Sequence, residues 1–161
     1  MWRALLPGLL WILAACSSQQ EPEDSGDYGF LTGTWSSPAD SGFTLILSRV
    51  CCGARARLYG VLRGRQEDRP LESGSRLEDY TVIKPDSEAP LIHILEVHLQ
   101  FGPSQEGAPC RMDGRVIDQS GNPELSGDLT TAAHKLMLDE WTWKESACVS
   151  DGEKREWVKS P

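Results

Sequence analysis

The sequence contains few cysteines and few basic residues for its length, and each shortage excludes a class of protein. Five cysteines in 161 residues are too few for a disulfide-dense miniprotein, and no two have the Cys-x-x-Cys spacing of structural zinc sites. The 16 basic residues against 24 acidic ones give a net charge of -8, which argues against a nucleic-acid binder. With 39% apolar and 25% charged residues, the chain is expected to fold as one compact domain.

Recognisable catalytic motifs are also missing. The sequence has no Gly-x-Ser-x-Gly, His-Glu-x-x-His or P-loop pattern, each of which would place reactive groups at a defined turn or helix. His93 and His98 are five residues apart, so on a strand they face opposite ways and cannot bind one metal ion together. We therefore predict a non-enzymatic protein without a cofactor, in which His93 is a core residue with satisfied hydrogen bonds.

The apolar run at the start of the chain is too short to cross a membrane. Arg3 is followed by twelve uncharged residues, Ala4–Ala15, whereas a spanning helix needs about 20 apolar residues. A basic residue before a short apolar run is the layout of an export signal. We expect residues 1–15 to be a signal peptide.

The end of this leader, Leu13-Ala14-Ala15-Cys16, resembles the bacterial lipobox at all four positions. The resemblance implies that Cys16 is lipidated and becomes the mature amino terminus. Ser17, in place of an acidic residue, implies sorting to the outer membrane, with the domain facing the periplasm or the exterior. Several acyl chains would anchor the protein stably, since one chain alone binds weakly. The alternative is a plain secreted protein whose cysteine follows two alanines by chance.

A polar segment separates the leader from the rest of the chain. Residues 16–29 contain four acidic side chains and only Tyr28 as a large side chain able to be buried, a composition typical of a solvated linker. From Phe30 onward, short apolar-patterned runs alternate with glycine, proline, asparagine and aspartate clusters, which is typical of β-structure. We predict a lipidated tether at 16–29 and a single domain at 30–161.

Alternation of apolar and polar residues predicts about eight strands in this domain. The segment 91–101 also fits a helical stripe, but Pro90 and Pro103 bound a run of only about a dozen residues, so we favour a strand. Tight returns are expected at Gln119–Pro123 and at Ser150–Gly152, where residues that tolerate positive φ are concentrated. The expected strands cover residues 43–48, 54–63, 77–84, 91–101, 111–118, 124–130, 143–149 and 153–159.

The segment before residue 143 leaves two interpretations open. Leu136 and Leu138 alternate in phase, whereas Trp141 and Trp143 have the opposite phase, so a bulge near Asp139–Glu140 would be needed to keep all four inside. The rival is a short helix over 131–138. Because no repeat of 20 to 50 residues is visible, solenoids and propellers are excluded. We predict an all-β, antiparallel up-and-down β-barrel, whose closure removes free strand edges.

Four cysteines follow Cys16, and an even number in an exported chain suggests disulfides. Because a bridge between adjacent residues is strained, we expect Cys51 and Cys52 each to pair with Cys110 or Cys148, in an order that stays open. The rival is a redox or metal-binding pair. It is disfavoured because adjacent strand residues point to opposite faces.

The opening of the domain, Leu31-Thr32-Gly33-Thr34-Trp35, resembles the first strand of avidin-like and lipocalin-like barrels, which share a Gly-x-Trp there. The resemblance implies structural roles: Gly33 permits a close turn into the strand and Trp35 closes the barrel floor. The biotin-contacting residues do not carry over, since Ser37 stands where avidins have an asparagine and Leu62 where they have a tyrosine. A different small ligand is therefore expected.

Aromatic residues provide the candidate ligand site. The barrel interior of about eight strands has room for side chains or for one small ligand. Trp141 and Trp143, together with Tyr59, are the candidates for lining such a cavity around a small apolar molecule. Filling of the core by the same tryptophans is the alternative.

Arginines provide the candidate partner site. Arg55, Arg57, Arg63 and Arg65 share one strand face and make a basic stripe on an otherwise acidic chain. Such a row suits an anionic envelope component, for example a phosphate-bearing lipid or an acidic protein. The alternative is cross-strand ion pairing with acidic residues at positions 72, 78 and 79 on a solvated face.

Cys16→Ser tests the lipid anchor. The variant lacks the thiol that would be acylated, so we expect a soluble or unprocessed product in place of a membrane-bound one. Fractionation of cells expressing the parent chain and the variant measures this. Membrane association that is unchanged in the variant would contradict the prediction.

Overall fold

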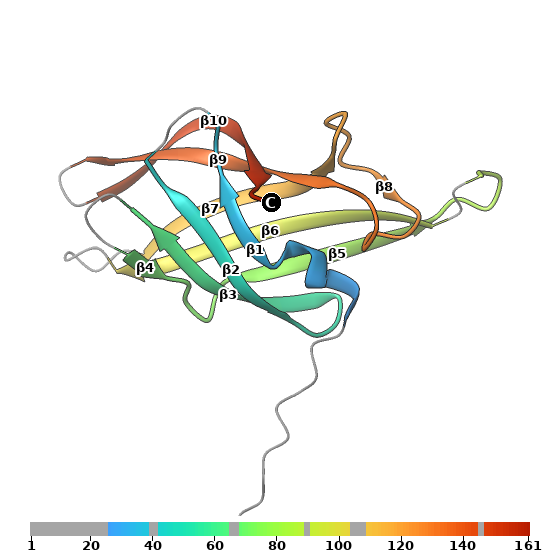
Figure 1. The fold of residues 1–161 in the computed structure, drawn as a ribbon, viewed down its shortest axis with the longest axis horizontal. Coiled ribbons are helices and arrows are strands. Elements are labelled where there is room, and N and C mark those ends of the chain that lie inside the picture. Colours follow the sequence, from blue (N-terminus) through green and yellow to red (C-terminus); the bar gives the residue numbers. More distant parts are fainter. Residues whose placement is uncertain (1–25, 39–41, 65–67, 89–90, 104–108, 145–146) are drawn as a thin grey trace, which may run out of the picture.

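The computed structural model describes residues 26–38, 42–64, 68–88, 91–103, 109–144 and 147–161, and its long elements are all strands (Figure 1). For residues 26–27, 103, 109, 141–144 and 147–152 it describes the backbone only. The elements are a 3-10 helix η1 (Gly26–Leu31) and the strands β1 (Gly33–Ser36), β2 (Thr44–Cys51), β3 (Arg55–Arg63), β4 (Asp68–Pro70), β5 (Arg76–Ile83), β6 (Leu91–Pro103), β7 (Pro109–Asp118), β8 (Leu125–Ser126), β9 (His134–Lys144) and β10 (Ala147–Lys159).

Eight of these strands form a closed ring. Going around it, β1, β2, β3, β5, β6, β7, β9 and β10 each pair antiparallel with the next, and β10 pairs with β1. The short strands β4 and β8 attach to β3 and β6 outside the ring. The predicted antiparallel up-and-down barrel is therefore confirmed, and the segment 91–101 is a strand within β6.

Alternation along each strand decides which residues enter the lumen. On β3, for example, Ala56, Leu58 and Leu62 are buried while Arg55 and Arg57 are exposed. The lumen of the described part is filled by interlocking side chains, as in an ordinary protein core. The large side chains that are fully buried are Trp35, Phe101, Leu31, Leu45, Leu47, Leu62, Leu77, Leu95, Leu99, Met112, Leu136 and Leu138.

The 3-10 helix η1 packs against the β2 side of the barrel and contributes to this core. Leu31 is fully buried and Tyr28 is 7% exposed, so the folded part includes the last residues of the segment expected to be a tether. The indole Nε1 of Trp35 donates a hydrogen bond to the carbonyl oxygen of Leu31 at 2.8 Å, which satisfies its one buried polar atom. Gly33, the first residue of β1, has a φ of +131°, a region that favours glycine.

The hairpin expected between residues 111–118 and 124–130 is wrong, and the strand expected at 124–130 is reduced to β8. A turn does follow β7, because the Asp118 carboxylate accepts backbone hydrogen bonds from Ser120 and Asn122, both at 2.8 Å. However, β8 has only two residues and pairs with β6, while β7 pairs with β9. A second turn at Asp128, whose carboxylate accepts from the Thr130 backbone at 2.9 Å, keeps β8 short.

The hairpin expected at Ser150–Gly152 is wrong as well. β10 continues through these residues, and the return from β9 lies between Lys144 and Ala147, which are ladder partners. Ser150 faces Trp141 but Lys154 faces Asp139, so β10 has extra residues here and bulges. The irregularity expected near Glu140 is thus present on the neighbouring strand. The rival helix over 131–138 is also wrong, since β9 begins at His134.

Gly114→Ala tests how closely β7 and β9 approach. A methyl group at Gly114 would lie 2.1 Å from the backbone oxygen of Met137, whereas one at Gly29 would have nothing within 4 Å. We expect Gly114→Ala to lower the free energy of unfolding by about 1–3 kcal/mol or more through overpacking, and Gly29→Ala to leave it nearly unchanged. Urea denaturation of both variants measures this, and equal midpoints would contradict the packing described.

Candidate partner-binding face

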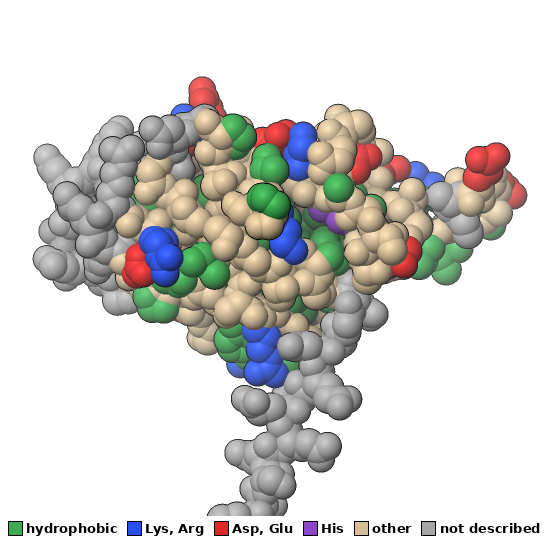
Figure 2. All heavy atoms as spheres, viewed as in Figure 1, with side chains coloured by type: hydrophobic (Ala, Val, Ile, Leu, Met, Phe, Trp, Pro, Cys, Tyr) green, Lys and Arg blue, Asp and Glu red, His purple; other side chains and the backbone are tan. Residues whose placement is uncertain are grey.

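The predicted basic stripe lies on the outer surface of β3. Arg55, Arg57 and Arg63 are exposed there, because the residues between them point into the lumen. Arg65 lies outside the described residues. Figure 2 shows lysine and arginine side chains gathered at the lower edge of the molecule, over the region where β2 and β3 run in Figure 1.

The two strands beside β3 enlarge this stripe. Arg49 on β2 is the ladder partner of Tyr59, and Arg76 on β5 is the ladder partner of Arg57. The guanidinium carbon of Arg49 lies 5.7 Å from the centroid of the Tyr59 ring, a cation–π distance. We call the outer surface formed by Arg49, Arg55, Arg57, Arg63, Arg76 and Tyr59 the basic face.

Acidic neighbours neutralise part of the basic face, and of the three acidic residues that the alternative interpretation named, Glu78 does so. Glu78 on β5 lies 2.7 Å from Arg76 and 3.9 Å from Arg55, and Asp68 lies 3.4 Å from Arg63. Among the described residues, no acidic oxygen lies within 4 Å of the Arg57 guanidinium. Arg57 and Arg76 are like charges on directly opposite ladder positions, an arrangement that is unfavourable in a sheet.

The assignment of Tyr59 to an interior ligand site is wrong. Its neighbour Leu58 points into the lumen, so Tyr59 points outward and is 42% exposed. The side chains of Trp141 and Trp143 lie outside the described ones; their backbones pair with Ser150 and Cys148 in the β9–β10 ladder. A ligand site at these two tryptophans therefore stays a prediction.

The expected long-range pairing of Cys51 and Cys52 is wrong, because the two form a disulfide with each other. Strand alternation would separate their side chains, but Cys52 lies beyond the end of β2 with a φ of +56°. The chain is already turning there, so the argument from strand faces does not apply. Cys110 is buried on β7 and is also disulfide-bonded. The side chain of Cys148 lies outside the described ones.

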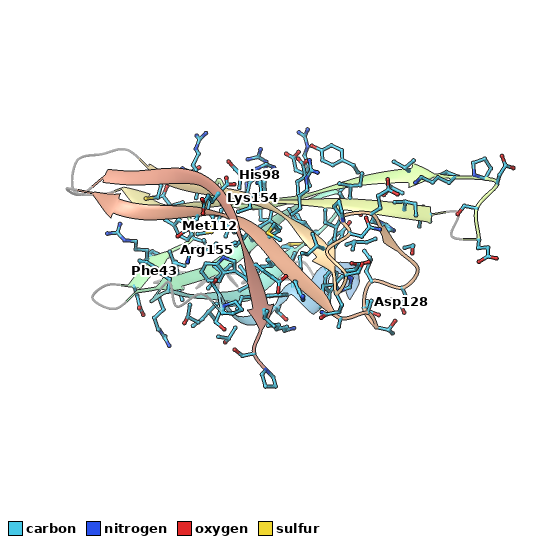
Figure 3. All side chains as sticks on the ribbon, turned by 90° about the horizontal axis from the view of Figure 1, so that it is seen from above. Phe43, His98, Met112, Asp128, Lys154 and Arg155 are labelled. Carbon is cyan, nitrogen blue, oxygen red and sulfur yellow. A yellow bond between two sulfur atoms is a disulfide. The ribbon has the colours of Figure 1, made fainter. Side chains whose placement is uncertain are left out.

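A network of ion pairs continues the basic face onto β6 and β7. Arg76 donates a hydrogen bond to Glu78, and together with the Tyr80 hydroxyl at 2.6 Å it lowers the pKa of Glu78 to about 2. On the next strands, His98 Nδ1 lies 2.7 Å from Asp113 and Arg115 lies 3.1 Å from Glu96. Figure 3 shows His98 projecting from the barrel surface.

Three side chains of this network have the composition of a metal site. One ligand atom each from Glu78, Glu96 and His98 lie within 4.8 Å of one another. Arg76 and Arg115, however, already neutralise the two carboxylates at 2.7 and 3.1 Å. The cluster is therefore explained as an ion-pair network on the outer surface of the sheet. A divalent cation bound there would have to displace the two arginines or be repelled by their positive charge.

A polar cluster that the sequence analysis missed lies at one mouth of the barrel. Asp79, whose side chain is 5% exposed, accepts a hydrogen bond from the Tyr28 hydroxyl at 2.5 Å and lies 2.9 Å from His93 Nδ1. These three residues line a hollow of about 200 Å³ together with the turn from Gly127 to Thr130. His93 is thus a hydrogen-bonded and largely buried residue, as expected. The alternation of the sequence could have indicated this cluster, because it places Asp79 and His93 on the lumen side of two neighbouring strands.

A shallow groove of about 380 Å³ lies on the outer surface of β7, β9 and β10. It is lined by Ile117 and Met137, by Gly121 and Pro123 of the turn, and by Arg115 and Lys154; Lys154 is labelled in Figure 3. It is separate from the basic face.

Among the described residues, no helix has the length and apolar character to cross a membrane.

No known protein family, curated protein or solved structure matches this chain. The fold alone defines it as a closed eight-stranded antiparallel β-barrel. Fold does not determine function, because barrels of this kind support many activities. The functional argument therefore depends on the side chains of the basic face and on the packing of the lumen.

Glu78→Gln tests the electrostatics of the ion-pair network. Because the pKa of Glu78 falls from 4.5 to about 2 on folding, the unfolded chain binds a proton first as the pH drops. The stabilisation that the ionised Glu78 carboxylate contributes is therefore complete above pH 4.5 and disappears as the pH approaches 2. We expect the variant to show a smaller loss of stability with acidification over this range than the parent chain.

Urea denaturation at a series of pH values measures this effect. The matched control is Glu88→Gln, which alters an exposed carboxylate in the turn after β5. An acid dependence that is the same in the Glu78 variant and the parent would contradict the assignment.

Proposed function

We propose that this chain is a lipid-anchored, non-enzymatic binding lipoprotein of the bacterial cell envelope, which binds an anionic envelope component through the basic face. The observation that carries the proposal is the pair Arg57 and Arg76. The two stand directly opposite each other on β3 and β5, although the chain as a whole has a net charge of -8. Glu78 already balances Arg76 at 2.7 Å, so the charge left for an anionic group to neutralise is that of Arg57.

The packing of the lumen supports a site on the outer surface. The lumen-facing side chains described on the ring strands are mostly large and apolar, with Trp35, Phe101 and Met112 among those that are fully buried. A barrel of eight strands holds either such side chains or a ligand. The interior of the described part is thus occupied by the core, and binding falls to exposed residues.

The chemistry of the basic face favours a phosphate-bearing partner. Arginine forms bidentate, charge-assisted hydrogen bonds to phosphate and carries its charge at every physiological pH. Directly opposite residues of an antiparallel pair have Cβ atoms about 5 Å apart, so Arg57 and Arg76 can both reach one phosphate group. Tyr59, beside them on β3, adds an aromatic surface held by Arg49. A phosphorylated lipid headgroup combines these requirements.

The anchor supplies the means of meeting such a headgroup. The proposal places acyl chains on Cys16, ten residues before the start of η1 at Gly26. Ten residues span at most about 35 Å when fully extended. A barrel held this close to the membrane would meet lipid phosphates at high effective concentration, so even a weak basic site would be occupied.

Charge reversal of the basic face is the experiment that tests this function. We expect the double variant Arg55→Glu with Arg57→Glu to bind vesicles containing phosphorylated lipid A at least about tenfold more weakly than the parent chain, because charge-assisted hydrogen bonds are lost. Binding of the parent chain should weaken as the salt concentration rises. Vesicle co-sedimentation measures both effects.

The control carries the same change of charge on another surface. Lys135→Glu with Lys154→Glu alters residues of β9 and β10 and should bind the vesicles nearly as the parent does. Equal binding by parent and basic-face variant, or an equal loss in both double variants, would contradict the proposed site.

A further inference from the structure

Among the described residues, strand β5 has a neighbouring strand on one side only beyond Asp79. Its ladder with β6 continues to the pair Ile83–Leu91, but its ladder with β3 stops at Glu78–Arg55. The last contact on the β3 side is the Asp79 backbone N–H, which donates to the Ala54 carbonyl at 2.9 Å. Figures 1 and 3 both show the β5–β6 hairpin projecting beyond the body of the barrel. Within the described part of the chain, the edge at residues 80–83 is therefore open.

The backbone groups that face this open edge can be identified. Asp79 directs its N–H toward β3, and along a strand successive residues direct their backbone groups to opposite sides. Thr81 and Ile83 therefore direct their N–H and C=O groups to the open edge, whereas Tyr80 and Val82 direct theirs to β6. Unpaired edge groups of this kind are a template for pairing with another strand.

The exposed apolar side chains of the molecule are concentrated on the same hairpin. Among the described residues five large hydrophobic side chains are exposed, and four of them are Tyr80 at 47%, Val82 at 42%, Ile83 at 72% and Leu91 at 42%. An apolar strand on a free edge is usually interrupted by charges, prolines or bulges, which prevent association. Here residues 80–83 contain no charge or proline, and Lys84 and Pro85 come after the last strand residue. The edge therefore lacks the residues that normally prevent pairing with another strand.

We propose that this edge pairs with the same edge of a second copy of this chain, as an antiparallel two-fold dimer centred on Val82. In this register Thr81 of each copy stands opposite Ile83 of the other, and the two residues exchange N–H to C=O hydrogen bonds. Val82 meets Val82 on the two-fold axis as a non-hydrogen-bonded pair, where side chains approach most closely. Tyr80 stands opposite Lys84, whose ammonium is bound to Glu124 of its own copy at 2.7 Å.

The ends of the edge select this register. One step further along, Asp79 of one copy would stand opposite Pro85 of the other. The Asp79 N–H is already bonded to Ala54, and Pro85 has no N–H to donate. Pairing therefore stops at both ends with no backbone donor left unpaired. If the two-fold axis passed through Thr81 instead of Val82, Ile83 of one copy would stand opposite Asp79 of the other. Ala54 already occupies that side of Asp79, so this register is blocked.

The occupant is a second copy because the edge is complementary to itself. The same residues supply donors and acceptors in equal number, and the apolar side chains meet their own kind across a two-fold axis, as isologous interfaces require. Five residues on each side make a small interface, well below the roughly 1,200 Å² of stable complexes. The dimer is accordingly weak in solution and depends on protein concentration.

Single cysteines test the register in the full-length chain. Val82→Cys places two thiols opposite each other on the axis, whereas Tyr80→Cys places them about 13 Å apart along the strands. Under mild oxidation with copper phenanthroline, we expect at least about tenfold more covalent dimer from Val82→Cys than from Tyr80→Cys, since disulfides need Cα atoms within about 7 Å. The double variant Tyr80→Cys with Lys84→Cys should also cross-link.

A proline variant tests the backbone pairing without altering the barrel. Thr81→Pro removes an N–H that faces the open edge and leaves the β6 ladder intact, so it should abolish cross-linking through Val82→Cys. Thr81→Val, which also loses the hydroxyl that donates to Asp79 at 3.3 Å but keeps the N–H, should still cross-link. It should also remove the concentration-dependent dimer from sedimentation equilibrium, and Ile83→Lys should do the same. Cross-linking that is equal at positions 80 and 82, its absence at both, or dimerisation that survives Thr81→Pro would overturn the proposal.

Discussion

Closure of the sheet at Trp35 is the constraint on which the other features depend. The ladder between the first and last strands of the ring has two residue pairs, Trp35 with Lys159 and Ser36 with Val158, and beside it the Ser160 N–H donates to the Thr34 carbonyl at 2.8 Å. The contact is reinforced by the Lys159 ammonium, which donates to the Phe30 carbonyl at 2.8 Å and lies 5.9 Å from the Trp35 ring centroid. The indole below is fully buried. Without this seam, β1 and β10 would be two free edges.

A closed and filled barrel has consequences for where binding can occur. Each strand must direct one set of side chains into the core, so the other set is free to vary in charge. On β3 and β5 the outward-facing side chains include four arginines. On β6 and β7 the outward-facing basic side chains Arg115 and His98 are paired with Glu96 and Asp113. The arginines are therefore placed by the same alternation that packs the lumen. Their clustering on one side gives an acidic protein a local concentration of positive charge.

Local patterning predicted the parts of this structure that depend on one strand at a time. Alternation identified the lumen residues of β3 and β6, and it placed Arg55 and Arg57 outside. It failed where the backbone departs from extended geometry: Cys52 sits in a left-handed turn, and the Asp151–Gly152 pair forms a bulge instead of a hairpin. The contacts of Arg57 with Arg76, and of Asp79 with Tyr28, depend on which strands become neighbours. That information is not contained in any short segment.

The central claim is that the outer face of β2, β3 and β5, and not the lumen, receives the anionic partner. Backbone amide chemical shifts, recorded while soluble phosphorylated headgroup is added to the protein, test this most directly. The account predicts that the shifts change on these three strands around Arg57 and Arg76 and saturate there. Changes confined to β9 and β10 around Trp141 and Trp143 would contradict it.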